Sequence, residues 1–488
     1  MALMKRSYGG IQPCIKAGLF RIRLPFIHFK ISPPEIATGL MNACTSYGAL
    51  AVLTTTLGLE PEVAWALVVL ETALYTCNWL FGEPSICGWI TPAMAIVILY
   101  LEGFDPGVVR IQALTAVQLE LALLFIFLGL TGLSKKLNTL VPPAIKAGIV
   151  LGAGVNAVYA RLVEGGAMDT VTWGCLAGLA VVFVLMFSKR VRKHMETNRL
   201  LQILGNYSFL WAVLAMFIVG GVTGEFHYNF SGEIIKVPDF GALFMAVSPF
   251  SIGFASLDIW ISAIPIALIA WVIAYGDFVT VQQLGLQAQR DDEYIEFDSN
   301  RTNVICGIRN LLLAFFAPYP ALAGPLSAPY CVATYQRYKQ DGRQGMDSIY
   351  DGSGTNIIFT VVGLFIYPIY EAAAAASAAM LVVVLCIQGF VCAQICFDLA
   401  KDKLDQGVAG MLAGFILARG GGVGLIAGIA LYLLLCDNNK IRSDYAGNKE
   451  EQRIEDEEAE RQLKALKEHM EAARAQSHEH LAEEEAKK

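Results

Sequence analysis

Charged side chains are scarce in this sequence of 488 residues: only 16% are Asp, Glu, Lys or Arg, whereas 55% are hydrophobic. Soluble domains carry about a quarter charged residues. The segment 437–488 holds 15 of the 43 acidic and 10 of the 36 basic residues, which leaves the rest of the chain close to neutral. Too few charges remain to cover a water-soluble body of that size, which excludes a soluble enzyme, a basic nucleic-acid binder and a disordered chain. The composition indicates an integral membrane protein.

Motifs of catalysis and metal binding are also missing. The sequence has no Ser-His-Asp arrangement, no phosphate-binding loop and no HExxH motif, and its eleven cysteines stand singly in apolar segments. The closest pair, Cys392 and Cys396, lies one helical turn apart in a hydrophobic run, where cysteines act as small packing residues. We therefore expect no enzyme activity, no metal site and no organic cofactor.

Apolar segments suited to a hydrocarbon core of ~30 Å occur fourteen times, in two groups of seven. We expect a basic segment (1–33), a first repeat (34–222), a polar connection (223–261), a second repeat (262–436) and an acidic helical tail (437–488). The last two segments are short and could instead form one hairpin. The expected spans are 34–58, 61–81, 83–102, 107–133, 141–162, 168–187, 200–222, 262–287, 303–318, 321–337, 355–371, 374–396, 406–418 and 421–436.

Basic residues predict the orientation of these spans, because cytoplasmic loops are enriched in Lys and Arg. The loops after the even-numbered spans are basic, at Lys135-Lys136, 189–193, 337–343 and 401–403, and so is the N-terminal segment. We therefore place both termini in the cytoplasm, in what we expect to be a bacterial inner membrane. The N-terminal segment mixes basic residues with Leu24-Pro25-Phe26-Ile27, which is typical of an amphipathic piece on a membrane surface.

The two groups of seven show internal similarity. Span one contains Ser46-Tyr47-Gly48-Ala49-Leu50 and span eight contains Ala274-Tyr275-Gly276-Asp277-Phe278; span three opens Gly82-Glu83-Pro84-Ser85 and span ten Gly324-Pro325-Leu326-Ser327. Because seven is odd, the second copy enters the membrane from the opposite side. The pattern predicts an all-α membrane protein built from two inverted repeats of seven segments, a hallmark of secondary transporters.

Segments three and ten are interrupted by Gly and Pro, at 82–92 and 319–329. Each is expected to form an extended stretch followed by a half-helix that begins near a proline. Two half-helix N-termini that face each other would present free N–H groups to an anion or a polar heterocycle. The alternative is that these prolines only kink two packed helices.

From these residues the chain resembles the inverted-repeat transporters that include the sulfate-permease (SulP) anion carriers and the nucleobase/ascorbate (xanthine–uracil) permeases. Ser46-Tyr47-Gly48-Ala49-Leu50-Ala51 is similar to the SulP first span, and Gly324-Pro325-Leu326-Ser327 to the SulP breakpoint in span ten. The nucleobase-permease signature is absent at 326–329, Ala328 replaces the polar residue common in anion carriers, and an acidic tail stands where SulP carriers usually have a STAS domain. The resemblance implies a core of spans one to four and eight to eleven that slides against a gate, in a homodimer.

Several side chains are candidates for the binding site. Asp277 matches the position of a span-eight acid in both branches, and an acid at membrane depth suits either proton coupling or acceptance of a substrate N–H. Arg309 could balance Asp277 or a bound anion, or form a structural ion pair. Hydroxyl groups are expected to line the cradle, with the alternative that each packs between spans; these are Tyr47, Tyr275, Ser85, Thr91, Ser327 and Tyr330.

Other ionisable residues in the spans have structural interpretations. We expect Glu71 and Glu120 to form polar contacts between helices, and Arg110 and Lys146 to extend from span ends toward water. Glu83 could face either a helix dipole or the cavity.

These features favour a secondary transporter of a small anion or polar anionic metabolite, working by an elevator motion, with H+ or Na+ as candidate coupling ions. A coupled nucleobase permease is the alternative of the same class, and a channel or a membrane sensor without transport is the alternative of another class. The expected partners are substrate, lipid, a second copy of the chain in a homodimer, and a cytoplasmic protein that could contact the tail at 448–488; no nucleic acid is expected.

Overall fold

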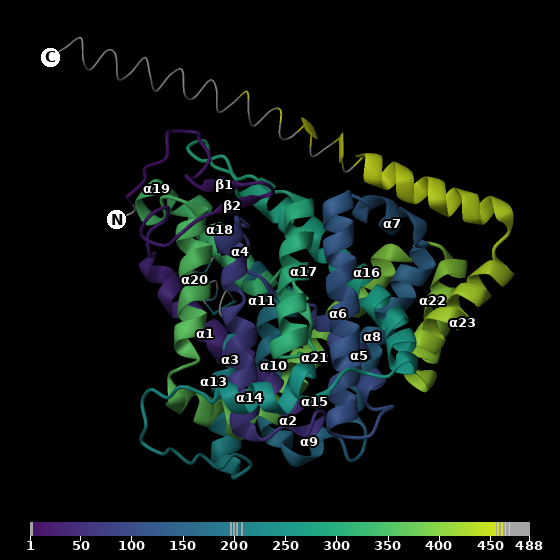
Figure 1. Ribbon diagram of the computed structural model, residues 1–488, viewed down its shortest axis with the longest axis horizontal. Coiled ribbons are helices and arrows are strands. Elements are labelled where there is room, and N and C mark those ends of the chain that lie inside the picture. The colour runs from purple at the N-terminus through teal and green to yellow at the C-terminus, as the bar shows by residue number, and fades with distance from the viewer. Residues whose placement is uncertain are drawn as a thin grey trace.

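Helices that run side by side form most of this protein, as the computed structural model shows (Figure 1). The structure describes residues 3–454 apart from 196, 197, 199, 200, 202, 203, 206 and 207, together with 456, 457, 460, 461, 464 and 468. Most of the tail at 448–488 therefore lies outside the described residues, and its contact with a partner protein stays a prediction.

After an N-terminal hairpin described below, the first half of the chain contains one further short strand and a series of helices. Proline occupies the first turn of α1, α3, α5 and α8, where its missing N–H costs no intrahelical bond. The elements are α1 (Pro33–Ser46), η1 (Tyr47–Ala49), α2 (Leu50–Thr55), α3 (Pro61–Ala73), α4 (Thr76–Phe81), β3 (Gly88–Trp89), α5 (Thr91–Leu101), α6 (Val108–Thr131), α7 (Ser134–Leu140), α8 (Pro143–Leu162), α9 (Ala167–Thr170), α10 (Thr172–Phe187), α11 (Lys189–Met195) and α13 (Ser208–Thr223).

The second half of the chain also consists of one short strand and a series of helices. Its elements are α14 (Phe240–Val247), α15 (Pro249–Ile252), α16 (Leu257–Ala288), α17 (Ser299–Phe316), β4 (Ala323–Gly324), α18 (Ala328–Gln340), α19 (Gly342–Gly345), α20 (Ile349–Gly363), α21 (Tyr367–Leu399), α22 (Lys403–Arg419) and α23 (Gly421–Leu435). A further helix, Asn438–Ile454, follows after a sharp bend. We call it the tail helix.

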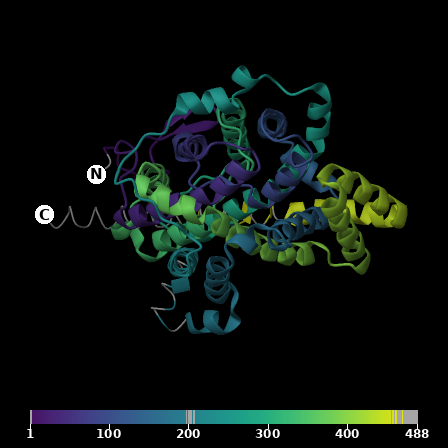
Figure 2. The ribbon, with the colours of Figure 1, turned by 90° about the horizontal axis from the view of Figure 1, so that it is seen from below.

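The two halves are interleaved in space. Helix α6 packs along α17 and α1 along α20, while α8 packs against both α21 and α22. Seen along the helices, the pair α10 and α13 projects from the side of the bundle (Figure 2). Neither half therefore encloses a core of its own.

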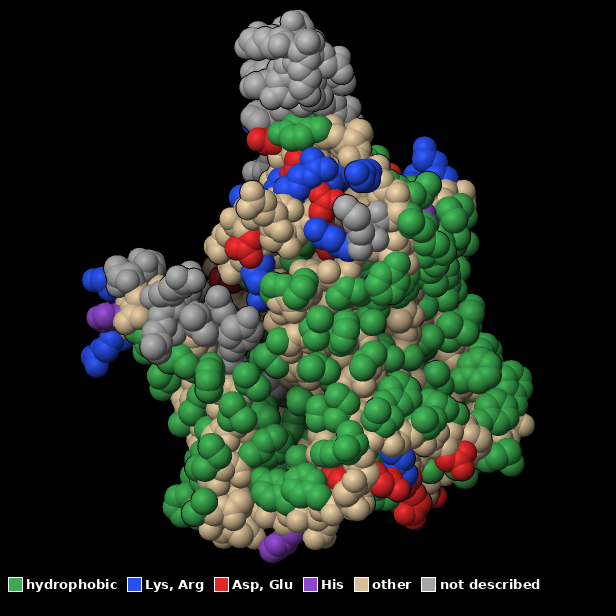
Figure 3. Space-filling model, turned by 90° about the vertical axis from the view of Figure 1, so that its left-hand side faces the viewer, with side chains coloured by type: hydrophobic (Ala, Val, Ile, Leu, Met, Phe, Trp, Pro, Cys, Tyr) green, Lys and Arg blue, Asp and Glu red, His purple; other side chains and the backbone are tan. Residues whose placement is uncertain are grey.

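Hydrophobic side chains cover the middle of the face seen in Figure 3 and separate charged side chains at its two ends. By length and composition, six of the described helices can cross a membrane, or up to eight if each bent pair counts as one span. This protein is therefore a multi-pass integral membrane protein, whereas the expected count of fourteen spans stays a prediction.

The N-terminal segment folds onto the protein. Residues 15–22 form an antiparallel hairpin of β1 (Ile15–Ala17) and β2 (Phe20–Ile22), and no helix occurs in the described residues before Pro33. Arg6 and Arg23 are buried against the bundle, whereas the apolar Leu3 and Phe26 are exposed, and the expected contact of this segment with a membrane surface stays a prediction. Residues 3–30 thus form a cap, which we call the N-terminal cap.

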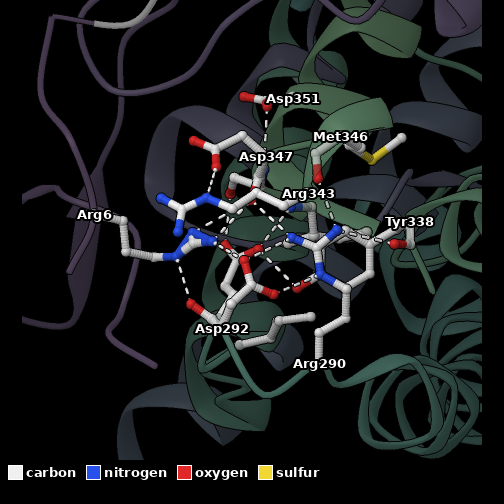
Figure 4. A network of polar contacts seen from close by, with 12 residues as sticks. Arg6, Arg290, Asp292, Tyr338, Arg343, Met346, Asp347 and Asp351 are labelled. Atoms are coloured by element: carbon white, nitrogen blue, oxygen red, sulfur yellow. Dashed lines mark hydrogen bonds and ion pairs between the residues drawn. The ribbon is translucent and has the colours of Figure 1, made fainter. Parts of the chain in front are cut away.

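Arginines fasten the N-terminal cap to the loops of the second half (Figure 4). Arg6 Nη2 lies 2.8 Å from Asp292 Oδ2, and Arg290 Nε lies 2.8 Å from the other oxygen of that carboxylate. Arg6 and Arg290 also donate to the carbonyl of Asp347, in the loop that precedes α20. Burial alone would raise the pKa of Asp292, but the two arginines outweigh it and hold this pKa below its usual range. The tail helix lies at the same end of the molecule as this cap (Figure 1).

Candidate functional site

The two interrupted segments meet in the middle of the fold. Strand β3 pairs antiparallel with β4, with Gly88 opposite Gly324 and Trp89 opposite Ala323. The pairing extends at both ends, because Ile90 N donates to the carbonyl of Ala321 and Ser327 N donates to the carbonyl of Ile86. We call this pairing the β3–β4 ladder.

Glycine is required in the β3–β4 ladder because the two backbones approach closely. A Cβ atom at Gly88 would lie 3.0 Å from the Leu326 carbonyl oxygen, and one at Gly324 would lie 3.0 Å from the Trp89 carbonyl carbon. These distances are shorter than normal van der Waals contacts, so the facing strand would have to shift by a few tenths of an ångström to admit a side chain. The glycines that break segments three and ten are thus the residues that let them pair.

Side chains from α6 and α17 complete the hydrogen bonds of this non-helical backbone. Asn310 donates to the carbonyl of Ala323 at 2.8 Å and accepts from its N–H at 3.0 Å. Gln118 on α6 donates to Asn310 Oδ1 at 3.2 Å and accepts from Tyr319 N at 2.8 Å. Non-helical backbone at membrane depth needs partners of this kind.

Arg309 lies behind the β3–β4 ladder. Its guanidinium donates to the carbonyl of Gly324 at 2.7 Å and to that of Gly88 at 3.3 Å, and it lies 3.9 Å from Glu71 Oε1. Arg309 and Glu71 are both fully buried. Of the alternatives for Arg309, the structure therefore shows the structural ion pair, and Glu71 forms the expected contact between helices.

Helices α5 and α18 begin at the two ends of the β3–β4 ladder and open on one cavity. The cavity has a volume of about 660 Å³ and includes Thr91 and Pro92 of α5 and Ala328, Pro329 and Tyr330 of α18 in its wall. Eleven and thirteen residues make these helices roughly 16 Å and 20 Å long, too short to cross the ~30 Å hydrocarbon core. A first helical turn leaves N–H groups without intrahelical partners, although Pro92 and Pro329 have no N–H and Ala93 N already donates to the carbonyl of Ile90.

The structure brings together some of the predicted site residues and separates others. Those on the cavity wall are Asp277, Tyr275, Thr91, Ser327 and Tyr330. Tyr47 lies elsewhere, because its hydroxyl donates to the carbonyl of Leu364 in the core. Ser85 is not among the residues of the wall, and its hydroxyl donates to the carbonyl of Pro325, next to Gly324 of the β3–β4 ladder.

Asp277 places a carboxylate on the wall of the cavity. It lies on α16, next to Gly276 and Tyr275, which also face the cavity. Within the described part of the chain, its carboxylate forms no hydrogen bond or ion pair. A carboxylate without a protein partner is free to bind a proton, a cation or a donor group of a ligand.

Two further ionisable residues differ from their expected places. Glu83 does not face the cavity or a helix end. Its Oε1 accepts a hydrogen bond from Nε of the buried Arg301 at 2.7 Å. Lys146 on α8 lies on the cavity wall rather than only extending toward water from a span end. Glu120 is half-buried on α6, where no hydrogen bond to another described residue satisfies its Oε2 atom.

Sequence reasoning missed a polar stripe on α1 that forms one side of the cavity. Asn42, Thr45 and Ser46 line it, and Asn42 is joined to Asn356 of α20 by a hydrogen bond of 3.3 Å. A signal was present, since Thr38, Asn42 and Ser46 follow one another at a spacing of four in an otherwise apolar span. Gln388 of α21 and Glu451 of the tail helix also belong to the wall. Among the described residues, no group of three His, Cys, Asp or Glu side chains could hold a metal ion.

Comparison with known proteins identifies similar folds. No family model and no curated protein sequence matches the chain. The transmembrane domain of the cyanobacterial bicarbonate transporter BicA matches it with 16% identity and a TM-score of 0.52, over 81% of this chain and 96% of that domain. A structure of the anion transporter SLC26A9 matches with 13% identity and a TM-score of 0.52, over 82% of this chain and 64% of that one. The predicted resemblance to SulP-type transporters is thus confirmed for the fold.

Proposed function

We propose that this protein is a secondary transporter that carries a small anion or polar anionic metabolite in the cavity between α5 and α18. The observation that carries the proposal is the β3–β4 ladder, which directs the first turns of two short helices into one cavity. Such first turns combine free N–H donors with the positive ends of helix dipoles, which together form an anion site.

The chemistry of the cavity wall supports an anion as cargo. Lys146 supplies a positive charge, and Thr91 and Ser327 supply hydroxyl donors at the two helix starts. The cavity is larger than a small inorganic anion, so such a cargo would keep part of its water shell. The shared fold with BicA, a bicarbonate transporter, supports the same class of cargo.

Asp277 suits the coupling of transport to H+ or Na+. Its carboxylate would oppose a bound anion, and a proton or sodium ion on it would remove that repulsion. Cation and anion would then favour each other's binding, which is the basis of symport.

The motion proposed for this architecture is that of an elevator. A core of spans one to four and eight to eleven would carry the cavity across the membrane, with α5 and α18 as half-helices of two inverted seven-segment repeats. The remaining spans would form the gate and the contact of a homodimer, with both termini in the cytoplasm.

Uptake into liposomes tests the proposal. We expect saturable, gradient-dependent uptake of bicarbonate, sulfate or a dicarboxylate by the purified protein. Ohmic current would instead indicate a channel, and uptake of xanthine or uracil without anion uptake would indicate a nucleobase permease.

Replacement of Lys146 tests the site itself. Lys146→Met removes a charged donor from the cavity wall and should raise the half-saturating anion concentration roughly tenfold. Lys136→Met, at an exposed lysine on α7, makes the same change in charge and should leave that concentration unchanged. Equal effects of the two variants would contradict the proposed site.

The coupling role of Asp277 needs a separate variant. Asp277→Asn should abolish proton or sodium flux driven by the anion, while the protein still folds and binds the anion. Wild-type coupling in this variant would remove the role assigned to Asp277.

A further inference from the structure

The tail helix crosses one end of the bundle and contributes to the wall of the cavity. It follows α23 after a bend of 118° and runs back over the neighbourhood of α7 (Figure 1). Glu451 from this helix and Asn138 from α7 both belong to the cavity wall. The tail helix, which follows the bundle helix α23, thus contributes to the wall of the cavity between α5 and α18.

One face of the tail helix is bonded to the bundle. Asn448 Nδ2 donates to the carbonyls of Thr139 and Val141 at 3.1 and 3.0 Å. These carbonyls lie at the C-terminal end of α7, where a helix leaves acceptors without intrahelical partners. One turn further on, Gln452 Oε1 accepts from the hydroxyl of Tyr275 at 2.9 Å. Tyr275 lies two residues before Asp277 on the cavity wall.

The start of the tail helix is fastened to a different part of the bundle. Lys440 Nζ lies 3.2 Å from Asp402 and 3.0 Å from Asp405, at the beginning of α22. The hydroxyl of Tyr432 on α23 donates to Asp444 at 2.6 Å. The tail helix therefore bridges α22 and α23 on one side to α7 and α16 on the other.

We infer that the tail helix is a removable cover of the cavity, held shut by Asn448 and Gln452. While it is seated, its side chains close the open end of the cavity. When α16 moves relative to α22, the tail helix cannot keep its bonds to α22 and α23 and also its bonds to α7 and α16. The bonds of Asn448 and Gln452 then break, and the cavity opens. The pair of bonds at α7 and the bond at α16 thus set how often the cavity is accessible.

Chemical labelling tests this cover without any assumption about transport. Ser46 lines the cavity, so Ser46→Cys provides a reporter for a charged, water-soluble maleimide added to the purified protein. Peptide mass spectrometry separates the reporter from the native cysteines. Replacing Asn448 and Gln452 together by Ala removes the three hydrogen bonds that these side chains form with the bundle and should accelerate labelling of the reporter roughly tenfold or more. Truncation after residue 437 should accelerate it at least as much.

Two controls make the outcome decisive. Lys449→Ala changes an exposed position of the same helix and should leave the labelling rate unchanged. Cys306 is buried within α17 and reports unfolding in the same sample, because only an unfolded protein exposes it. If unfolding affects the double variant, Gln452→Ala alone should still accelerate labelling several-fold while Cys306 stays protected. Equal rates in wild type, Gln452→Ala and Lys449→Ala would overturn the inference, whatever the transport assays show.

Discussion

Replacing Arg309 by Met removes a charged side chain that joins the β3–β4 ladder to Glu71. Breaking a buried ion pair from one side costs about 3–5 kcal/mol, because the remaining charge stays buried without a partner. The carbonyls of Gly88 and Gly324 also lose the hydrogen bonds from Arg309, and a hydrogen bond to a charged group contributes about 1.5–3 kcal/mol. These costs overlap and do not add fully, but even the smaller is a large part of a typical stability of about 5–15 kcal/mol.

The distances from Arg309 to its partners predict which variant loses more stability. Arg309 lies 2.7 Å from the Gly324 carbonyl oxygen but 3.9 Å from Glu71, so its bonds to the backbone should dominate. Glu71→Gln keeps these bonds and should therefore destabilise less than Arg309→Met. The double variant should recover about 1–3 kcal/mol relative to the sum of the single changes, because it leaves no unpaired charge.

Unfolding of the purified protein in detergent, followed by tryptophan fluorescence, measures this series. Arg343→Met is the matched control, since Arg343 forms an exposed ion pair with Asp347 and such pairs contribute at most about 1 kcal/mol. The reasoning would be refuted if Arg309→Met were no less stable than Arg343→Met, or if Glu71→Gln were the more damaging single change.

Two further predictions concern backbone packing and pH. Gly88→Ala should lower the midpoint of thermal unfolding and weaken anion binding, because overpacking costs about 1–3 kcal/mol. Gly48→Ala should leave both unchanged, because nothing lies within 4 Å of an added Cβ there. Equal midpoints in the two variants would argue against close packing in the β3–β4 ladder. Arg290 and Arg6 lower the pKa of Asp292, so its ionised form stabilises the N-terminal cap above the ordinary Asp pKa of about 3.9, and this stabilisation is lost as the pH falls below that value. Limited proteolysis of the cap should therefore accelerate on acidification in the wild type and depend less on pH in Asp292→Asn; parallel profiles would show that Asp292 does not hold the cap.

The repeated Gly-Pro breaks allowed the centre of the fold to be predicted from the sequence. Matched interruptions in segments three and ten implied that they meet, because non-helical backbone in a membrane needs partners, and the structure pairs Gly88 with Gly324. Hydrophobic length also located the long helices such as α6 and α16, although it could not show that α6 packs on α17.

The direction of individual side chains could not be predicted in the same way. Ser85 and Ser327 occupy matching positions in the two repeats, yet only Ser327 reaches the cavity. Likewise, the partner of Glu83 is Arg301, 218 residues away, and no local pattern connects the two. Such contacts depend on how the interleaved halves rotate against each other, which a periodic pattern of hydrophobic residues does not specify.

The β3–β4 ladder has a consequence for how the chain is made. Ser85 and Pro325 contact each other across 240 residues, so the first edge of the ladder is synthesised long before its partner. At typical rates of about 5–20 residues per second, that edge waits roughly 10–50 s inside the lipid or the insertion machinery. During biogenesis the nascent protein must therefore shelter an unpaired backbone, through water, a chaperone or a temporary helix, until the ribosome delivers the second repeat.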